Sequence, residues 1–233
     1  MPPDPPELRV LSTLGVMEVL RDLAPVFERA AGLRIAAQYA PTKSLVERIA
    51  AGEAADIAIL TEAAVEALMA AGTLQPGSRV DLARSFVGLA VRAGAPQPDI
   101  GSAEAVRHAL LEASSIAYSR AGASGIFFVE LIRRLGIEAA VNAKATVIPE
   151  GLTGELVARG EAALAVQQVS ELMAVTGIDI IGRLPAEVAG VTTFSGAVFA
   201  GAGQAAAAAA LLAFLAGRQH HARIAAGGLE PVA

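Results

Sequence analysis

Side chains that could bind a charged ligand gather where an expected strand turns into an expected helix. Three such turns carry hydroxyl and cationic groups: Ser12 and Thr13, then Thr42 and Lys43, then Ser119, Arg120 and Ser124. A hydroxyl at a helix start commonly caps the helix, but the same N-terminus attracts anions through its unpaired backbone N–H groups. Lys43 lies in a first helical turn, where a cation opposes the helix dipole. The turns therefore predict an anion site, with helix capping as the ordinary alternative.

Two glutamines add to these turns. Gln167 and Gln168 interrupt an otherwise apolar expected strand. Successive strand residues point to opposite faces, so both amides are buried if the strand is central. Because a buried amide costs free energy unless it is hydrogen-bonded, we expect at least one of the two to face the ligand.

Five amphipathic helical stretches position the turns, and each ends in a glycine. These glycines are Gly32, Gly52, Gly72, Gly136 and Gly160. Glycine just past a helix end takes the left-handed conformation at little cost. Strand-like apolar runs follow three of them, at residues 33–40, 55–60 and 162–169. This order predicts an α/β fold whose mainly parallel sheets bind ligands at the carboxyl ends of their strands.

The remaining elements follow from the same patterns. Strands are expected at residues 8–12, 33–40, 56–60, 86–91, 115–118, 145–148, 162–169 and 192–200. Helices are expected up to residue 31, after residues 41–44, from 61 to near 72, and at 104–112, 125–135, 153–158, 204–216 and 219–226. Ser44 and Glu47 have the spacing of a capping box.

The alternation of expected strands and helices is interrupted twice along the chain. Residues 82–85 predict a crossing between lobes, and residues 178–190 predict a return linker. We therefore expect a first lobe of residues 1–84 and 190–233, a second lobe of residues 85–189, and a ligand cleft between them. Hinge motion at the two crossings would close the lobes on the ligand.

Composition excludes several classes of function. The 233 residues have a formal net charge of −5 and only 4% aromatic residues, which argues against a nucleic-acid partner. The chain contains no cysteine, so disulfides, thiolate catalysis and cysteine metal sites are excluded. His108, His220 and His221 form neither a zinc pattern nor a serine–histidine triad. No metal ion or organic cofactor is expected.

Membrane insertion is not expected either. Hydrophobic residues make up 54% of the chain, but much of the excess is alanine. No apolar run reaches the ~18 residues that a membrane-spanning helix needs. Residues 1–7 have neither a basic start nor an apolar core, so they do not predict a signal peptide.

Six short stretches carry a family likeness. They are VDLARS at 80–85, RAGAP at 92–96, IAYS at 116–119, SGI at 124–126, QQVSEL at 167–172 and LPAEV at 184–188. They resemble the type II periplasmic solute-binding proteins, and most closely the molybdate-binding-like subgroup. The resemblance runs from about Leu8 to the C-terminus. It implies a two-lobed type II periplasmic-binding-protein fold, each lobe a mainly parallel sheet flanked by helices. Aconitate isomerase, which moves a proton along a tricarboxylate on this scaffold, resembles the subgroup too.

The resemblance also implies which residues bind the ligand. Molybdate binders hold the oxyanion with backbone amides at helix N-termini, serine hydroxyls and a tyrosine. The corresponding turns, which include Glu150 and Gly151, imply this set: Ser12, Thr13, Gly15, Thr42, Lys43, Ser119, Arg120, Ser124, Gly125, Gln167 and Gln168.

Three departures from the molybdate pattern bear on the ligand. Gln168 stands at the tyrosine position, and Lys43 and Arg120 bring cations to two turns. A tetrahedral dianion needs no formal cation, because amides and helix dipoles suffice. Carboxylates suit cations, and arginine can bind both oxygens. We therefore expect an organic acid rather than molybdate.

These observations predict a solute-binding protein that closes on a small anion, with an organic polycarboxylate favoured. One alternative is an isomerase of unsaturated carboxylic acids, in which Lys43, Glu150 or Tyr118 is the general base. The ordinary alternatives are a loop carboxylate for Glu150 and a core or hinge position for Tyr118. Molybdate or tungstate binding for an ABC transporter is a second alternative, and a ligand-sensing domain ranks last.

Partner and compartment are implied by the resemblance alone. It implies the periplasm and an ABC transporter permease as a partner. The absent signal pattern in residues 1–7 keeps the cytoplasm open, and we expect a monomer.

Overall fold

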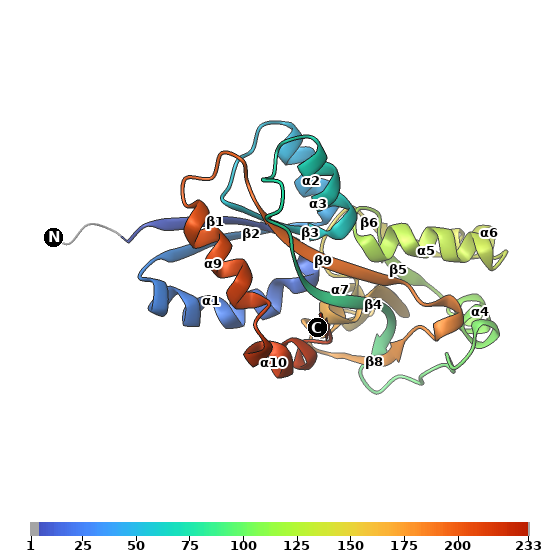
Figure 1. Ribbon diagram of the computed structural model, residues 1–233. Helices are drawn as coiled ribbons and strands as arrows, with labels where there is room; N and C mark the ends of the chain where they lie inside the picture. Colours follow the sequence, from blue (N-terminus) through green and yellow to red (C-terminus); the bar gives the residue numbers. More distant parts are fainter. Residues whose placement is uncertain (1–4, 233) are drawn as a thin grey trace. The chain divides into compact units, whose positions relative to one another are not determined.

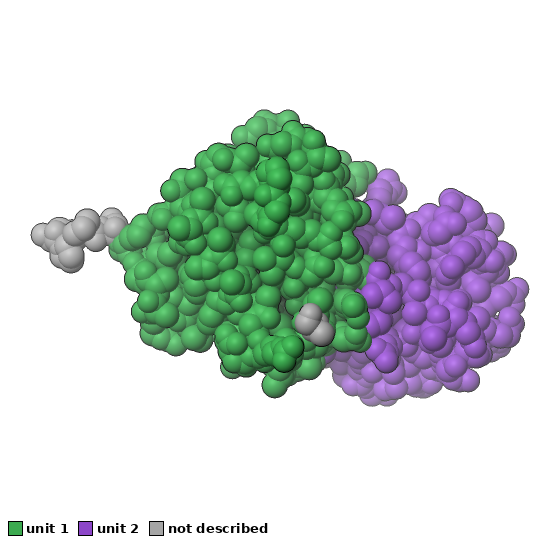
Figure 2. Space-filling model, in the orientation of Figure 1, with its two compact units in different colours: residues 1–84, 192–233 green, residues 85–191 purple. Residues whose placement is uncertain are grey.

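The computed structural model describes residues 5–232, and the chain divides into two compact units (Figures 1 and 2). Unit 1 contains the described residues up to Arg84 and those from Thr192 onward, and unit 2 is Ser85–Val191. The chain therefore returns to unit 1 after Val191, where we expected residue 189. Residues 1–4, part of the stretch analysed for a signal peptide, lie outside the described residues. The ligand cleft stays a prediction.

The sheet of unit 1 is mixed. Its strands are β1 (Glu7–Ser12), β2 (Arg34–Tyr39), β3 (Ile57–Thr61), β9 (Val191–Val198), the start of β4 (Val80–Arg92) and β10 (Glu230–Pro231). β1 lies between β2 and β3 and is parallel to both. β9 runs antiparallel to β3, and β10 runs antiparallel to β4. The carboxyl ends of the three parallel strands therefore meet at one edge of unit 1.

Helices cover both faces of this sheet (Figure 1). They are η1 (Leu14–Val16), α1 (Met17–Ala31), α2 (Thr42–Ala50), α3 (Glu62–Ala70), α9 (Ala205–Leu215), η3 (Arg218–His220) and α10 (His221–Ala226). Alternate residues of β3 enter two separate cores. Ile57 and Ile59 pack with residues of α1, α9 and α10, whereas Leu60 packs with residues of α2 and α3. Because both faces of β3 are covered, the strand is apolar from Ile57 to Leu60.

Unit 2 repeats the arrangement around a second mixed sheet. Its strands are the end of β4 with β5 (Ile116–Ser119), β6 (Ala145–Ile148), β7 (Leu164–Gln168) and β8 (Ile178–Arg183). β5 lies between β6 and β7 and is parallel to both. β4 runs antiparallel to β7 and β8. The helices are α4 (Ala103–Glu112), α5 (Ala123–Arg134), α6 (Glu138–Asn142), α7 (Thr153–Ala158), α8 (Val169–Leu172) and η2 (Ala186–Val188).

Most expected strands and helices are confirmed, and so is the α/β class. All five helix-ending glycines have positive φ, Gly32 at 67° for example. The expectation of mainly parallel sheets needs one correction, since β4, β8, β9 and β10 all pair antiparallel. The sheets are mixed because each crossing strand enters its sheet in the opposite direction.

Two local predictions are wrong. Residues 178–183 were expected in a linker but form β8, where Ile180 pairs with Ala90 of β4. The capping box at Ser44 fails because α2 begins two residues earlier, with Pro41 as its N-cap and no side-chain cap. The short helices α6, α8 and η2 and strand β10 were not expected.

Candidate functional site

In unit 1 the site candidates lie where β1 ends. Ser12 pairs with Tyr39, the last residue of β2, and with Ile59 of β3, which continues for two more residues to Thr61. The Ser12 hydroxyl is buried and donates to the Thr13 carbonyl at 3.1 Å. The Thr13 backbone N–H donates to the Ile59 carbonyl at 2.8 Å. The Thr13 N–H therefore links the end of β1 to β3, whereas the Ser12 hydroxyl makes a local bond within its own turn.

Gly15 has a structural reason to be glycine. A Cβ atom at this position would lie 2.3 Å from the Phe194 ring of β9. Phe194 is fully buried in the core of unit 1, so the ring has no room to move. Close packing of η1 on the sheet explains Gly15 without a ligand.

Thr42 and Lys43 begin α2, and the two side chains differ in their surroundings. Among residues 5–232, the buried Thr42 hydroxyl oxygen has no hydrogen-bond partner. The Lys43 side chain is 59% exposed, and its ammonium lies 4.0 Å from the Glu47 carboxylate one turn along the helix. Thr42 thus has an unused hydrogen-bonding group at a helix start, whereas Lys43 is a solvated surface cation in this structure.

In unit 2 the corresponding turn joins β5 to α5. The buried Ser119 hydroxyl accepts the Gly122 N–H at 2.9 Å, and Gly122 is the N-cap of α5. A Cβ atom on Gly125 would lie 1.5 Å from the Ser119 carbonyl oxygen. The first turn of α5 therefore packs directly on the end of β5, which only glycine at position 125 allows.

Ser124 lies in that first turn. Its side chain is buried, with a residue exposure of 1%. Its hydroxyl oxygen has no partner within the part of the chain that the structure describes. A buried polar group without a partner costs free energy, so a hydroxyl kept here needs a reason. An anion at the start of α5 would supply the missing partner and face the positive end of the helix dipole.

Arg120 follows directly after β5. Its backbone N–H donates to the Ile148 carbonyl of β6 at 2.8 Å, which fixes the main chain at the sheet edge. Its side chain is exposed, and no carboxylate within residues 5–232 pairs with it. Arg120 is therefore a cation on a fixed backbone whose guanidinium pairs with no carboxylate of the described residues.

Gln167, at the end of β7, is engaged within the protein. Its amide oxygen accepts the Thr153 N–H at 2.7 Å and the Thr153 hydroxyl at 2.9 Å. Its amide nitrogen donates to the Gly151 carbonyl at 3.0 Å. This buried amide therefore tethers the β6–α7 turn, residues 149–152, to the end of β7.

Glu171 is the titratable group of this region that sequence reasoning missed. It lies in α8 and is buried, with an exposure of 7%. Burial raises the pKa of its carboxyl to about 7, against the lowering effect of hydrogen bonds from the Gln168 backbone and the Gln167 side chain. A local signal in the sequence could have drawn attention to Glu171. It follows Gln168, the N-cap of α8, by three residues, and this is the spacing of a capping box.

The candidate general bases lie in different surroundings. Tyr118 packs in the core of unit 2, with its ring centroid 5.1 Å from that of Phe128. Its hydroxyl lies 3.4 Å from the Asn142 side-chain oxygen. Glu150 is exposed in the β6–α7 turn. Packing accounts for Tyr118 without catalysis.

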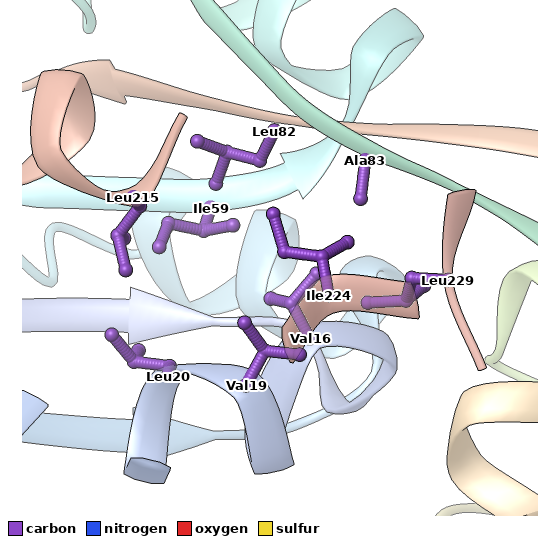
Figure 3. A pocket seen from close by; sticks show the side chains of 9 residues that line it. All are labelled: Val16, Val19, Leu20, Ile59, Leu82, Ala83, Leu215, Ile224 and Leu229. Carbon is purple, nitrogen blue, oxygen red and sulfur yellow. The ribbon is translucent and has the colours of Figure 1, made fainter. Parts of the chain in front are cut away.

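Within the described chain, neither a metal-ligand cluster nor the aliphatic hollow of unit 1 supplies an anion site. No group of three or more histidine, aspartate or glutamate side chains within residues 5–232 could hold a metal ion. Figure 3 shows a hollow in unit 1 lined by aliphatic side chains, including Leu20, Ile59 and Ile224. Its lining offers an anion no hydrogen-bond donor. No helix in the described part of the chain is long and apolar enough to cross a membrane.

Comparison with known proteins decides the family. Residues 8–230 match the family described as bacterial extracellular solute-binding protein. The chain belongs to this family. The predicted resemblance to the type II, molybdate-binding-like group of solute-binding proteins is thereby confirmed.

A curated relative and two solved structures add detail. The chain is 40% identical over 231 residues to an aconitate isomerase from Pseudomonas sp, covering 97% of this chain and 88% of the relative. The periplasmic molybdate-binding protein of Azotobacter vinelandii has a TM-score of 0.81 at 19% identity, covering 95% of this chain and 98% of that one. The sulfate-binding protein SubI of Mycobacterium tuberculosis has a TM-score of 0.75 at 17% identity, covering 97% and 87%. At these identities the two solved structures support the fold alone.

Proposed function

We propose that this solute-binding protein binds a small organic polycarboxylate of the aconitate class. The proposal rests on two buried hydroxyls, those of Thr42 and Ser124, that have no hydrogen-bond partner within residues 5–232. Each lies in the first turn of a helix, one in unit 1 and one in unit 2. Helix starts favour anions, and these hydroxyls would donate to the ligand what they lack in the protein.

The proposed chemical class of the ligand is supported by Arg120 and by the name of the relative that is 40% identical. Arg120 offers a guanidinium that can hold both oxygens of a carboxylate. The relative at 40% identity is named for aconitate, a tricarboxylate. If the protein serves uptake, an ABC transporter permease is the expected partner.

A matched pair of variants tests the role of the hydroxyls. Ser124→Ala removes a hydroxyl that has no partner among the described residues, so we expect unchanged or slightly higher stability and an affinity for trans-aconitate at least about tenfold lower. Ser195→Ala is the control, because its buried hydroxyl donates to Asp81 at 2.7 Å. It should lower the free energy of unfolding by about 1–3 kcal/mol and leave affinity unchanged.

Calorimetric titration and thermal unfolding of both variants measure these effects. Thr42→Val extends the test to unit 1, with the same loss of affinity expected. Equal affinity in wild type and Ser124→Ala would show that the α5 start does not contact the ligand.

A second candidate function is isomerisation of an unsaturated polycarboxylate, favoured by the relative named aconitate isomerase. Such an enzyme needs a group that takes a proton from one carbon and returns it to another. Glu150, exposed in the β6–α7 turn that Gln167 tethers, and Lys43 remain candidates for this group.

An NMR time course of trans-aconitate with the purified protein tests this candidate. Conversion to the cis isomer that disappears in Glu150→Gln would support catalysis. Binding without any conversion over many hours would leave a solute-binding protein that is not an isomerase.

A further inference from the structure

The β6–α7 turn, residues 149–152, leaves the sheet of unit 2 beside the proposed anion position. Ile148, the last residue of β6, pairs with Ser119, the last residue of β5. The Ile148 carbonyl also accepts the Arg120 N–H at 2.8 Å. The turn therefore begins next to the residue whose guanidinium is proposed to hold a carboxylate of the ligand.

This turn has little support of its own. Within residues 5–232, the backbone N–H groups of Glu150, Gly151 and Leu152 donate to no protein group. Gly151 has a φ of 100°, which residues with a side chain rarely adopt, and a Cβ atom there would meet no atom within 4 Å. Pro149 and Glu150 are exposed. The turn can therefore keep one arrangement only if a group outside it holds it.

One side chain of β7 supplies that support. The Gln167 amide oxygen accepts the Thr153 N–H at 2.7 Å and the Thr153 hydroxyl at 2.9 Å, and the amide nitrogen donates to the Gly151 carbonyl at 3.0 Å. Gln167 and Thr153 are 2% and 0% exposed, so bulk water does not compete for these bonds. Because the bonds reach residues on both sides of Leu152, a single side chain ties the end of the turn to β7.

Only an amide of this length suits the position. The side chain must accept two hydrogen bonds through one group and donate one through another, which an ionised glutamate or an aliphatic side chain cannot do. The preceding residues of β7, Leu164, Ala165 and Val166, are all buried and apolar. The bonds to the turn therefore account for a polar side chain at this point of an apolar strand.

We propose that Gln167 is a positioning residue for anion binding, which holds the β6–α7 turn in one arrangement beside Arg120 before the ligand arrives and does not itself contact the ligand. The inference rests on the proposed function. A site that is already ordered loses less conformational entropy on binding, so its affinity is higher. Gln167 therefore acts on the ligand through Gly151 and Thr153, whereas the sequence predicted direct contact.

A purely structural role is the ordinary explanation for the same bonds. Buried hydrogen bonds stabilise a fold wherever they lie. A structural role predicts that their loss lowers the melting temperature of the protein and leaves its affinity for the ligand unchanged. A positioning role predicts that affinity falls as well, and that two variants that break the same tether do not add their effects.

The test is calorimetric titration of trans-aconitate into variants of the tether. Gln167→Met keeps the length of the side chain but removes all three bonds, and it should lower affinity about tenfold. Thr153→Val removes only the hydroxyl bond and should lower affinity in part, whereas Thr153→Ser keeps a hydroxyl and should bind like the wild type. The double variant of Gln167→Met and Thr153→Val should have the affinity of Gln167→Met alone.

A control variant and a spectroscopic measurement separate positioning from stability. Ser115→Ala is the matched control, because the Ser115 hydroxyl accepts the Ala163 N–H at 2.9 Å, just before β7 begins. Its loss should leave affinity unchanged. Backbone NMR resonances of Glu150 and Gly151 measure the order of the turn directly. They should be sharp in the ligand-free wild type and broadened in ligand-free Gln167→Met.

Each outcome has a separate meaning. No binding of trans-aconitate by the wild type contradicts the proposed function itself. Wild-type affinity in Gln167→Met, or an equal loss of affinity in Ser115→Ala, overturns the inference and leaves the proposed function intact. If Gln167→Met does not fold, the Thr153 variants decide, since equal affinity in Thr153→Val and the wild type overturns the inference as well.

Discussion

Arg120 and Lys43 lie at similar strand-to-helix turns, but they differ in whether a carboxylate lies beside the side chain. The backbone of Arg120 is fixed by the Ile148 carbonyl, and its guanidinium has no carboxylate partner within residues 5–232. Lys43 lies on the exposed side of α2 beside Glu47. Because an exposed ion pair along a helix contributes little, Lys43 can leave Glu47 for an anionic ligand, whereas Arg120 has no carboxylate partner to leave within residues 5–232.

Replacing Arg120 with alanine should therefore lower the affinity for trans-aconitate by more than about tenfold, since a charge-assisted contact to a carboxylate is lost. Calorimetric titration measures the change. Arg134→Ala provides the control, because Arg134 is an exposed arginine at the other end of α5. Should Arg120→Ala bind as tightly as wild type, Arg120 lies outside the site.

The sequence predicted which side chains lie near helix starts and strand ends, but it did not predict the hydrogen-bond partners of those side chains. Ser124 and Gln167 were both expected to face a ligand. Ser124 has a buried hydroxyl without a partner in the described chain, whereas Gln167 is engaged by Thr153 and Gly151. That difference depends on how a turn fourteen residues earlier folds back onto β7. Side-chain type alone carries no such information.

At the scale of elements, local signals predicted the helix ends and most strands. Glycine after an amphipathic stretch marks a helix end because only the local φ matters, and Gly32 and Gly136 both have φ of 67°. β8 was missed because its partner β4 lies far away in the chain, and its residues are only half-buried. A strand that depends on a distant partner has a weak local pattern.

In the first turn of α5, a single residue determines how a helix packs on a strand. Gly125 lets the helix approach the Ser119 carbonyl, and this approach places the Ser124 hydroxyl at the strand end. The sequence shows Ser-Gly only as a cap pattern. The structure gives the glycine a packing role and leaves the Ser124 hydroxyl without a partner among the described residues.

For the molecule as a whole, the family is established while the ligand is proposed. A net charge of −5 gives no general attraction for an anion, so binding depends on local donors and helix starts. The fold is shared with proteins named for molybdate and sulfate, and the sequence is closer to one named for aconitate. Only direct binding separates these ligands.

The most direct measurement is thermal unfolding of the wild type with trans-aconitate, citrate, tricarballylate, molybdate or sulfate. A ligand at ~100 times its dissociation constant stabilises by ~2.7 kcal/mol, which raises the melting temperature of a chain this size by roughly 5–10 °C. We predict such a rise with trans-aconitate and none with molybdate or sulfate. A rise with molybdate or sulfate alone would contradict the carboxylate proposal and assign the helix starts to an inorganic oxyanion.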